Sequence, residues 1–461
     1  MPISSISETS LLEKKSQIAV VGLGKMGLPI AMCFTHAGFT VTGLDISEPI
    51  VADLNKGLTA INEPHVEERL KQAIASRRFR ATTSAKDALS NADFVILIIP
   101  VLVDSSSKVN LDPLIETYKS LIECMNLGSI FIQESTLPPG TTQNIIKPLF
   151  EDKGLVDGKD FGLVFAPERT FSGRAIQDIE ENYPKIIGAT HPNSVEPTKL
   201  LYEQIAKKGV ITVSDATTAE AIKTFKGAYR DANIAIANQF AVLSDKLGID
   251  VNEVIEVANT EPFSHIHTPG IGVGGHCIPV YPHFIINIGK EFEYEPKVLS
   301  DARRVNDDMV KYAIDEVAKI VPSWDRNVLI LGLAYRGGIK EHRLSPTLRL
   351  VQELRMKGID RLKVCDPLYT EKEIDSLFGN GTGFPTEADW QATMTNALRW
   401  SSVIFIVTDH EEFKHLDYLL LSNKIVYDGR YVISEALARD FYLLQPGRLS
   451  KSLLRSTGKL N

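Results

Sequence analysis

The chain has 461 residues, a formal net charge of −8 and a sequence pI of about 5.8. An acidic chain without a basic run is a poor partner for nucleic acid and for anionic membranes. Its N-terminus lacks the apolar core of a signal peptide, and its longest apolar run, at 94–103, is about half the length that crosses a membrane. The four cysteines form no CxxC pair, so we predict neither a disulfide framework nor a metal site. We therefore expect a globular cytoplasmic protein.

The first part of the chain alternates apolar strands with helices. QIAVVGLG at 17–24 predicts a strand that ends in glycines, and the apolar periodicity of 28–37 predicts a helix after it. Further strands are predicted at 40–45, 94–100, 129–136 and 163–168. Strands that are apolar throughout are buried on both faces of a sheet. The pattern thus predicts an α/β fold with a doubly wound parallel sheet.

The first strand leads into a dinucleotide-binding pattern. In Gly22-Leu23-Gly24-Lys25-Met26-Gly27, Gly22 permits the tight turn, Gly24 lets the backbone approach a pyrophosphate, and Gly27 lets helix and strand pack closely. Asp45 ends the second strand, where its carboxylate accepts hydrogen bonds from ribose hydroxyls and repels a 2′-phosphate. The sequence therefore predicts an NAD site.

A long helix is predicted from Ala216 to Gly248. The stretch has neither proline nor a strand-like block, and Gly227 is the one glycine before its end. A helix of about nine turns exceeds the radius of a domain, so it should bridge two domains or form the seam of a homodimer.

A glycine-rich loop at 269–284, PGIGVGGHCIPVYPHF, carries Cys277. Its glycines leave the backbone free to approach a ligand, and a thiol on such a turn is suited to attack an aldehyde. The resulting thiohemiacetal can lose hydride to NAD. The other cysteines, Cys33, Cys124 and Cys365, are interpreted as small buried hydrophobes.

The last third of the chain repeats the first. IAVVGLGKMG at 18–27 corresponds to VLILGLAYRG at 328–337, and DALSNADFVILIIP at 87–100 to NALRWSSVIFIVTD at 396–409, with offsets of 310 and 309 residues. Asp366 then corresponds to Asp45. We predict two Rossmann-like domains joined by a long central helix: an NAD-binding domain at 1–214, a central helical domain at 215–320 and a second, C-terminal Rossmann-like domain at 321–461.

The second glycine turn differs from the first in one position. Gly332-Leu-Ala334-Tyr-Arg-Gly337 has a methyl group where Gly24 stands, and that Cβ blocks the closest approach to a pyrophosphate. Arg336, Lys340 and Arg343 crowd the same loop, which suits a phosphorylated substrate. A solvated, charged loop is the alternative interpretation.

Taken together, these motifs resemble the UDP-glucose/GDP-mannose dehydrogenase family of nucleotide-sugar 6-dehydrogenases. The resemblance runs from residue 17 to about 435 and is carried by a set of segments: GLGKMGLPIA (22–31), ESTLPPGTT (134–142), APERTFSG (166–173), EAIKTFKGAYRDANIAIANQ (220–239), GVGGHCIP (272–279), GLAYRGGIKEHRLSP (332–346), VTDHEEF (407–413) and VYDGR (426–430). EPFSHIHTPG at 261–270 is closer to the N-acetylhexosamine branch than to the UDP-glucose enzymes.

The resemblance implies a four-electron oxidation in polysaccharide biosynthesis. A UDP-sugar, expected to be a UDP-N-acetylhexosamine, is oxidised at C6 to an aldehyde, which Cys277 captures. A second hydride transfer leaves a thioester, and water releases the carboxylate. In this scheme Glu168 assists hydrolysis and Lys223 stabilises the alkoxide. A plain salt bridge for Glu168 and a solvated lysine for Lys223 are the alternatives.

The remaining site residues are also implied by the resemblance. The residues expected at the cofactor are Gly22, Leu23, Gly24, Met26, Gly27, Asp45, Pro100, Ser135, Thr136 and Arg343. Those expected at the substrate are Glu168, Arg169, Lys223, Phe263, Gly274, Gly275, Tyr335 and Arg336.

Two positions depart from the family pattern. Tyr281 stands where the family usually has an aspartate, and Gly227 where it has an asparagine; those two groups hold the water that takes the alcohol proton. Tyr281, His276 or His283 could replace them.

Three alternative functions stay open at this level. The enzyme could be a UDP-glucose 6-dehydrogenase, or a two-electron dehydrogenase of the β-hydroxyacid type. It could also be a catalytically altered homologue that only binds nucleotide sugars, because of Tyr281 and Gly227.

Overall fold

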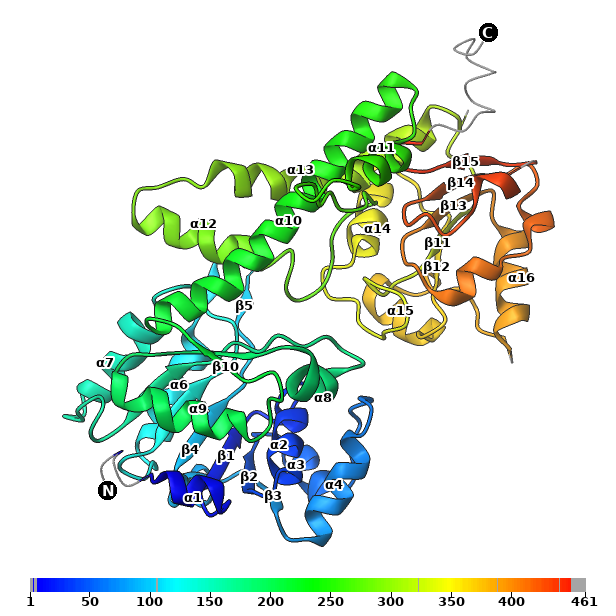
Figure 1. Cartoon of the computed structure of the whole chain (residues 1–461). Coiled ribbons are helices and arrows are strands. Elements are labelled where there is room, and N and C mark those ends of the chain that lie inside the picture. Colours follow the sequence, from blue (N-terminus) through cyan, green and yellow to red (C-terminus); the bar gives the residue numbers. More distant parts are fainter. Residues whose placement is uncertain are drawn as a thin grey trace. The chain divides into compact units, whose positions relative to one another are not determined.

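The computed structural model describes residues 3, 6–104, 107–321, 323–387, 389–438 and 440–448. The chain forms two compact units, coloured along the sequence in Figure 1. The first contains Met1–Lys226 and His283–Tyr294, and the second contains Gly227–Pro282 and Glu295–Asn461.

The first unit is built on an eight-stranded sheet with the order β10-β9-β8-β7-β4-β1-β2-β3. Neighbouring strands are parallel except for the antiparallel pair β8–β9. The strands are β1 (Gln17–Val21), β2 (Thr40–Leu44), β3 (Phe79–Thr82), β4 (Phe94–Leu97), β7 (Ile130–Gln133), β8 (Gly162–Phe165), β9 (Lys185–Ala189) and β10 (Val210–Thr212). A small antiparallel pair, β5 (Leu102–Val103) and β6 (Val109–Asn110), lies outside this sheet.

Helices connect these strands. They are α2 (Gly27–His36), α3 (Glu48–Asn55), α4 (Val66–Ala75), α5 (Ala85–Leu89), α6 (Asp112–Ile122), α7 (Lys147–Glu151), α8 (Ala175–Gln177) and α9 (Val195–Glu203), and α1 (Glu8–Leu12) precedes the first strand. Two hydrophobic clusters cover the two faces of the sheet. In β1, Ile18 and Val20 enter one cluster, whereas Ala19 and Val21 enter the other. Because successive side chains of a strand point to opposite faces, this double burial explains why the strands are apolar throughout.

The second unit contains a five-stranded parallel sheet with the order β12-β11-β13-β14-β15. Its strands are β11 (Val328–Leu331), β12 (Leu362–Cys365), β13 (Val403–Ile406), β14 (Ile425–Asp428) and β15 (Tyr442–Leu444). The helices that connect these strands are α14 (Pro346–Met356), α15 (Glu371–Phe378) and α16 (Trp390–Trp400). Hydrophobic clusters again cover both faces of the sheet.

The two sheets repeat one pattern of strand pairing. In the first, β1 lies between β2 and β4, with Ile18 paired to Phe94. In the second, β11 lies between β12 and β13, with Val328 paired to Val403. These pairs are separated by the same offsets as the sequence repeats, so the duplication is structural as well.

The predicted long helix is α10, which runs from Ala216 to Leu247. Gly248, with a φ of +72°, ends it, and its N–H donates to the carbonyl of Ser244 at 2.8 Å. The helices α11 (Val251–Ala258), α12 (Tyr281–Glu291) and α13 (Lys297–Ala318) follow. No helix among the described residues is long and apolar enough to cross a membrane.

The fold class is therefore confirmed: α/β, with two Rossmann-like sheets and a long central helix. The first sheet differs from the prediction at one edge, because β9 and β10 run antiparallel to the other strands. The predicted domain boundaries, 1–214, 215–320 and 321–461, stay a prediction.

Candidate active site

The first glycine turn is shaped by close backbone contacts. Gly22 has a φ of +89°, and a Cβ there would lie 2.5 Å from the carbonyl oxygen of Ile98. A Cβ on Gly27 would lie 1.7 Å from the carbonyl oxygen of Gly22. Gly24 differs, because a Cβ added there would meet no other heavy atom of the described residues within 4 Å. Gly22 and Gly27 are thus required by packing, whereas the space at Gly24 admits a ligand.

Asp45 is held at the end of β2 by two backbone groups. Its Oδ2 accepts the N–H of Leu23 at 2.9 Å, and its Oδ1 accepts the N–H of Ser47 at 3.0 Å. The side chain is only half-buried, so lone pairs on both oxygens remain accessible. This arrangement fits the recognition of ribose hydroxyls.

The ends of β4 and β7 contribute further polar and apolar groups. Pro100 is exposed just after β4. The Oγ of Ser135 is buried and has no hydrogen-bond partner among the described residues. A buried polar atom of this kind calls for a partner, and a bound dinucleotide would supply one. Met26 contacts the neighbouring loop, with its Sδ 3.5 Å from the Oγ1 of Thr170.

The segment after β7 is anchored by a buried carboxylate that the sequence pattern did not reveal. Glu220, on α10, accepts the N–H of Gly140 at 2.5 Å, and the N–H and Oγ1 of Thr142 at 2.8 and 2.5 Å. Burial raises the pKa of Glu220 to about 7. A glutamate within the apolar pattern at the start of the long helix was the available signal.

Two of the predicted catalytic residues lie together. The Nζ of Lys223, on α10, donates a hydrogen bond to the backbone carbonyl of Glu168 and lies 3.7 Å from Glu168 Oε2. The other carboxylate oxygen of Glu168 accepts the N–H of Thr170. The two side chains are only 12% and 20% exposed. A cation and a carboxylate are therefore paired at the end of β8 in a largely enclosed setting.

Arg169, the next residue, points to a different place. Its Nη1 donates to the carbonyl of Pro184 at 3.2 Å, and its guanidinium lies 5.3 Å from the ring centre of Tyr183. It borders a cavity of about 30 Å³, whose wall includes Glu168, Glu134, Lys185 and Tyr202. Glu134 is buried there with Lys185 Nζ at 2.7 Å, and it also accepts a hydrogen bond from Tyr202.

The cysteines differ in exposure. Cys277 is exposed, Cys33 and Cys365 are buried, and Cys124 is half-buried. Burial raises the pKa of Cys33 well above its usual value and that of Cys365 to about 12. Since the thiolate is the reactive form, neither buried thiol is a nucleophile near neutral pH.

The Cys277 loop rests on the second glycine turn. Gly275, with a φ of +101°, donates its N–H to the carbonyl of Arg343 at 2.8 Å. A Cβ on Gly275 would lie 3.0 Å from the ring of Tyr335, and one on Gly274 would lie 2.7 Å from the Cβ of Tyr335. These glycines are therefore needed for contact with Tyr335, a reason that the sequence did not reveal.

Polar contacts tie the same loop down on both sides of the cysteine. Arg430 Nη2 donates to the carbonyl of Gly272 at 3.1 Å, and Gly270 N–H donates to Asn238 Oδ1 at 2.8 Å. His276 Nε2 lies 3.2 Å from Glu341 Oε2. The carbonyl of Cys277 accepts the N–H of Tyr281 at 3.0 Å, which begins α12. The thiol is thus exposed on a turn that is fixed at several points.

The second glycine turn cannot bind a dinucleotide in the way that the first turn can. Asp366 Oδ2 accepts the N–H groups of Leu333 and Ala334 at 2.7 and 3.0 Å and lies 3.1 Å from His410 Nε2. The side chain of Asp366 is buried, which by itself raises the pKa of this carboxyl, but His410 and backbone hydrogen bonds outweigh the burial and keep the pKa below its usual value. Unlike Asp45, Asp366 is therefore not accessible to the hydroxyl groups of a ribose.

The charged groups of that turn are only partly engaged. Lys340 pairs with Glu373 at 2.6 Å. Arg336 is half-buried, and the Nε of Arg343 is buried without a hydrogen-bond partner in the part of the chain that the structure describes. Phe263 lies elsewhere in the second unit, with 88% of its surface exposed.

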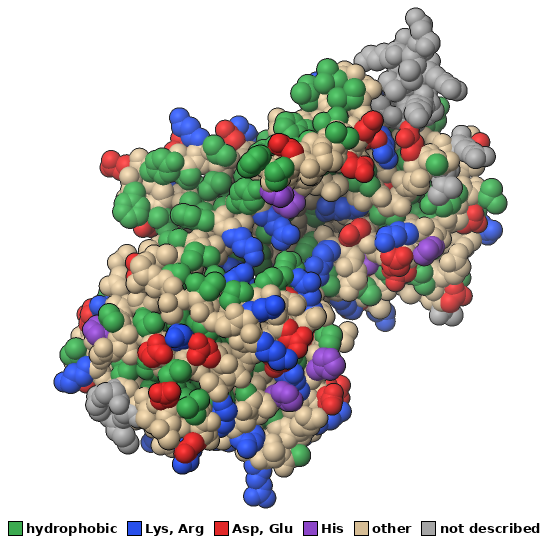
Figure 2. Space-filling view, in the orientation of Figure 1, with side chains coloured by type: hydrophobic (Ala, Val, Ile, Leu, Met, Phe, Trp, Pro, Cys, Tyr) green, Lys and Arg blue, Asp and Glu red, His purple; other side chains and the backbone are tan. Residues whose placement is uncertain are grey.

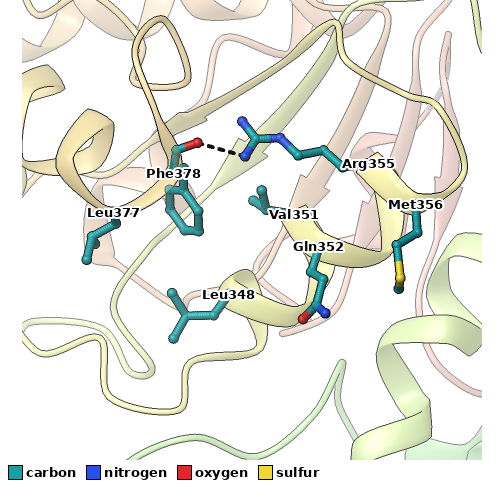
Figure 3. A pocket seen from close by; sticks show the side chains of 7 residues that line it. All are labelled: Leu348, Val351, Gln352, Arg355, Met356, Leu377 and Phe378. Atoms are coloured by element: carbon teal, nitrogen blue, oxygen red, sulfur yellow. Dashed lines mark hydrogen bonds between the residues drawn. The ribbon is translucent and has the colours of Figure 1, made fainter.

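Figure 3 shows a separate groove in the second unit, between α14 and α15, with a volume of about 420 Å³. Its wall is mostly apolar and includes Leu348, Val351 and Phe378. Arg355 closes one side by donating to the carbonyl of Phe378 at 2.7 Å. None of the predicted site residues lines this groove, so we do not assign the reaction to it.

One open dinucleotide turn, a second turn closed to dinucleotides and an exposed cysteine together define an oxidoreductase of the Rossmann class. Three domains of the UDP-glucose/GDP-mannose dehydrogenase family match the chain: the NAD binding domain at 16–206, the central domain at 217–308 and the UDP binding domain at 329–435. The chain belongs to this family. It is an NAD-dependent nucleotide-sugar dehydrogenase with a UDP-binding domain.

Relatives and solved structures agree with this assignment. The chain is 35% identical to a UDP-N-acetyl-D-mannosamine dehydrogenase of Pyrococcus horikoshii over 429 residues, which cover 91% of this chain and 96% of that one. It is 30% identical to an NDP-N-acetyl-D-galactosaminuronic acid dehydrogenase of Ralstonia nicotianae, over 90% of this chain and 95% of that one. The solved structure of the UDP-D-ManNAc dehydrogenase from P. horikoshii superimposes with a TM-score of 0.82 at 33% identity, covering 94% of this chain and 99% of that one.

Proposed function

We propose that the protein oxidises C6 of a UDP-N-acetylhexosamine to a carboxylate, with two equivalents of NAD. The observation that carries this proposal is the exposed Cys277, held on a loop that rests on the glycine turn of the UDP-binding domain. A two-electron dehydrogenase needs neither a covalent thiol nor a second Rossmann-like domain.

The N-acetylated sugar is supported by the relatives. Those at 30–35% identity are named as dehydrogenases of UDP-N-acetyl-D-mannosamine or of NDP-N-acetyl-D-galactosaminuronic acid. A panel of UDP-sugars separates this substrate class from UDP-glucose, because a site that is built for an N-acetyl group leaves polar atoms unpaired without it.

The first half of the reaction is alcohol oxidation. When NAD is bound, it supplies the hydride acceptor. The Lys223 ammonium stabilises negative charge on the C6 oxygen as the hydroxyl proton passes to water. Its hydrogen bond to the Glu168 carbonyl limits the positions that the ammonium can take.

The second half is covalent. Cys277 Sγ bonds to the aldehyde carbon, and the proton of the thiol passes to the aldehyde oxygen to give a thiohemiacetal. Loss of hydride from that carbon and of the hydroxyl proton leaves a thioester. Glu168 then accepts a proton from water as the water attacks the thioester carbon. The C–S bond breaks, Glu168 returns the proton to Cys277 Sγ, and the product leaves as a carboxylate that has lost its remaining proton to solvent. Covalent capture keeps the aldehyde from escaping.

The decisive experiment counts NADH per molecule of sugar in the wild type and in Cys277→Ala. The wild type should yield two NADH per UDP-N-acetylhexosamine and a product with the mass of the uronate. Cys277→Ala should lose uronate formation by about a thousandfold or more, because the thioester cannot form. Cys124→Ala is the matched control and should match the wild type.

Three outcomes would contradict the proposal. A yield of one NADH would favour a two-electron enzyme, and binding of UDP-sugars without turnover would favour a binding protein. Uronate formation by Cys277→Ala at the wild-type rate would exclude the covalent route.

The protein is also proposed to form a homodimer through α10. Five exposed apolar residues follow one another along this helix at spacings of seven, four, three and four, which places them on one face: Tyr229, Ile236, Phe240, Leu243 and Leu247. Figure 2 shows hydrophobic side chains gathered over the C-terminal part of α10 and over α11, which are labelled in Figure 1. Exposed apolar patches of this kind favour a protein partner.

A further inference from the structure

Gly227 lies inside α10, where glycine is one of the least favourable residues for a helix. A Cβ at this position would lie 2.3 Å from Cδ2 of Tyr281 and 3.2 Å from its Cβ. Even an alanine at 227 would therefore overlap the tyrosine unless the ring moved, and contacts of 3.1 and 3.2 Å to its Cγ and Cβ would remain tight if the ring only turned about its own axis. The side chain of Tyr281 is 7% exposed. The aromatic ring thus occupies the place where a side chain of residue 227 would stand.

Each partner of this contact follows a proposed catalytic residue by one helical turn. Gly227 is four residues after Lys223 on α10, and residues four apart lie on the same face of a helix. Tyr281 is four residues after Cys277, and its N–H donates to the Cys277 carbonyl at 3.0 Å. The contact therefore joins the turn that carries Cys277 to the turn of α10 that follows Lys223.

We propose that Tyr281 and Gly227 form a matched pair of positioning residues for Cys277. The Tyr281 ring packs directly on the backbone of α10 at Gly227 and so fixes the position of the turn that carries Cys277. A change in the size of either side chain alone should therefore displace that turn. It is the volume of the Tyr281 ring, not its hydroxyl group, that positions the turn. This inference rests on the proposed function for its catalytic consequence, but the contact itself does not depend on it.

The same geometry bears on the residues that could replace the family's aspartate and asparagine. His276 pairs with Glu341, with its Nε2 3.2 Å from Glu341 Oε2, and its side chain is about half exposed. Tyr281 is buried on α10 beside the turn that follows Lys223. The two departures from the family pattern are consequently one structural change, since the glycine makes the space that the tyrosine fills.

A double-mutant cycle tests the pair. Gly227→Ala forces the ring away, and Tyr281→Ala removes it; each should lower kcat by about tenfold or more with the KM for the UDP-sugar within about threefold, because misplacement of a reacting group slows chemistry more than binding. The double variant Gly227→Ala/Tyr281→Ala should recover part of the loss, because the added methyl group then enters the vacated space. Tyr281→Phe retains the ring and should stay within about threefold of the wild-type kcat.

Hydrogen exchange of the peptide 277–284 provides a second readout that does not need turnover. Tyr281→Ala should speed exchange in this peptide, and Tyr281→Phe should not. If the wild type oxidises no UDP-sugar, the proposed function fails, while the exchange data still test the pair.

Two results would overturn the inference. One is a double variant no better than its worse parent. The other is a Tyr281→Phe variant as slow as Tyr281→Ala, which would assign the role to the hydroxyl group.

Discussion

At the scale of single residues, the two aspartates that end the second strand of each Rossmann-like sheet show how surroundings decide a role. Asp45 is held by two backbone N–H groups and stays half-buried, whereas Asp366 is buried against His410. Asp45 can accept hydrogen bonds from a ligand, whereas the hydrogen bonds of Asp366 are made within the protein. Identical residues at equivalent positions thus have different surroundings.

The Asp45→Asn variant tests this assignment. We expect the KM for NAD to rise about tenfold, because a charge-assisted hydrogen bond is worth about 1.5–3 kcal/mol. The preference for NAD over NADP should fall, since the charge that repels a 2′-phosphate is lost. Steady-state kinetics with each cofactor provides the measurement. Asp53→Asn, which changes an exposed carboxylate, is the control, and an unchanged cofactor preference in Asp45→Asn would refute the assignment.

At the scale of elements, α10 organises the first unit through buried polar contacts. Glu220 holds the segment after β7, and Lys223, one turn later, contacts the Glu168 backbone at the end of β8. The helix therefore sets the position of two loops that follow neighbouring strands. Loops at the carboxyl ends of parallel strands are where ligands bind in such sheets.

The raised pKa of Glu220 predicts a pH dependence of stability. Its folded pKa is about 7 and its ordinary value is 4.5, so the folded state binds the proton more tightly. The unfolding free energy should fall as the pH rises from about 4.5 to about 7 and should then level off. The decrease due to Glu220 should be up to about 3 kcal/mol. Urea unfolding of the wild type and Glu220→Gln at several pH values measures it.

The glutamine variant should lack this contribution, so the difference between the two proteins should change across that window. Glu256→Gln, at an exposed position on α11, is the matched control. A difference that is constant with pH would show that Glu220 does not titrate as stated.

At the scale of the whole molecule, the apolar face of α10 has a counterpart on α11. Val254 and Val257 are 45% and 64% exposed and lie in the same unit as the apolar face of α10 that begins at Tyr229. Exposed aliphatic and aromatic side chains that gather on one surface favour a protein partner. In the homodimer proposed above, a second copy of the chain would cover them.

The Leu243→Glu variant tests the dimer. A charge in the centre of this apolar face should convert the protein to a monomer in analytical ultracentrifugation, because burying an unpaired carboxylate is costly. Val156→Glu places the same charge on an isolated exposed valine of the first unit and should not change the mass. A wild-type protein that sediments as a monomer would contradict the proposal.

Much of the fold could be predicted from local patterns. Gly22 and Gly27 mark the turn from β1 to α2, and continuous apolar runs mark strands buried on both faces. The repeat at offsets of 310 and 309 residues predicted two similar sheets, which the pairings of Ile18 and Val328 show. The antiparallel edge at β9 could not be predicted in this way, because strand direction depends on where a connection returns to the sheet.

The candidate site, like the fold, could be predicted from the sequence only in part. The sequence by itself determined the class of chemistry: a dinucleotide turn with its aspartate, an isolated cysteine among glycines, and a duplicated half with a blocked turn. Only the tertiary structure decided which groups are paired or enclosed: Lys223 with Glu168, Asp366 with His410, and Tyr281 on Gly227. Spacing along a chain constrains turns and helix faces, whereas contacts between distant segments depend on how whole elements pack, and no short motif records that.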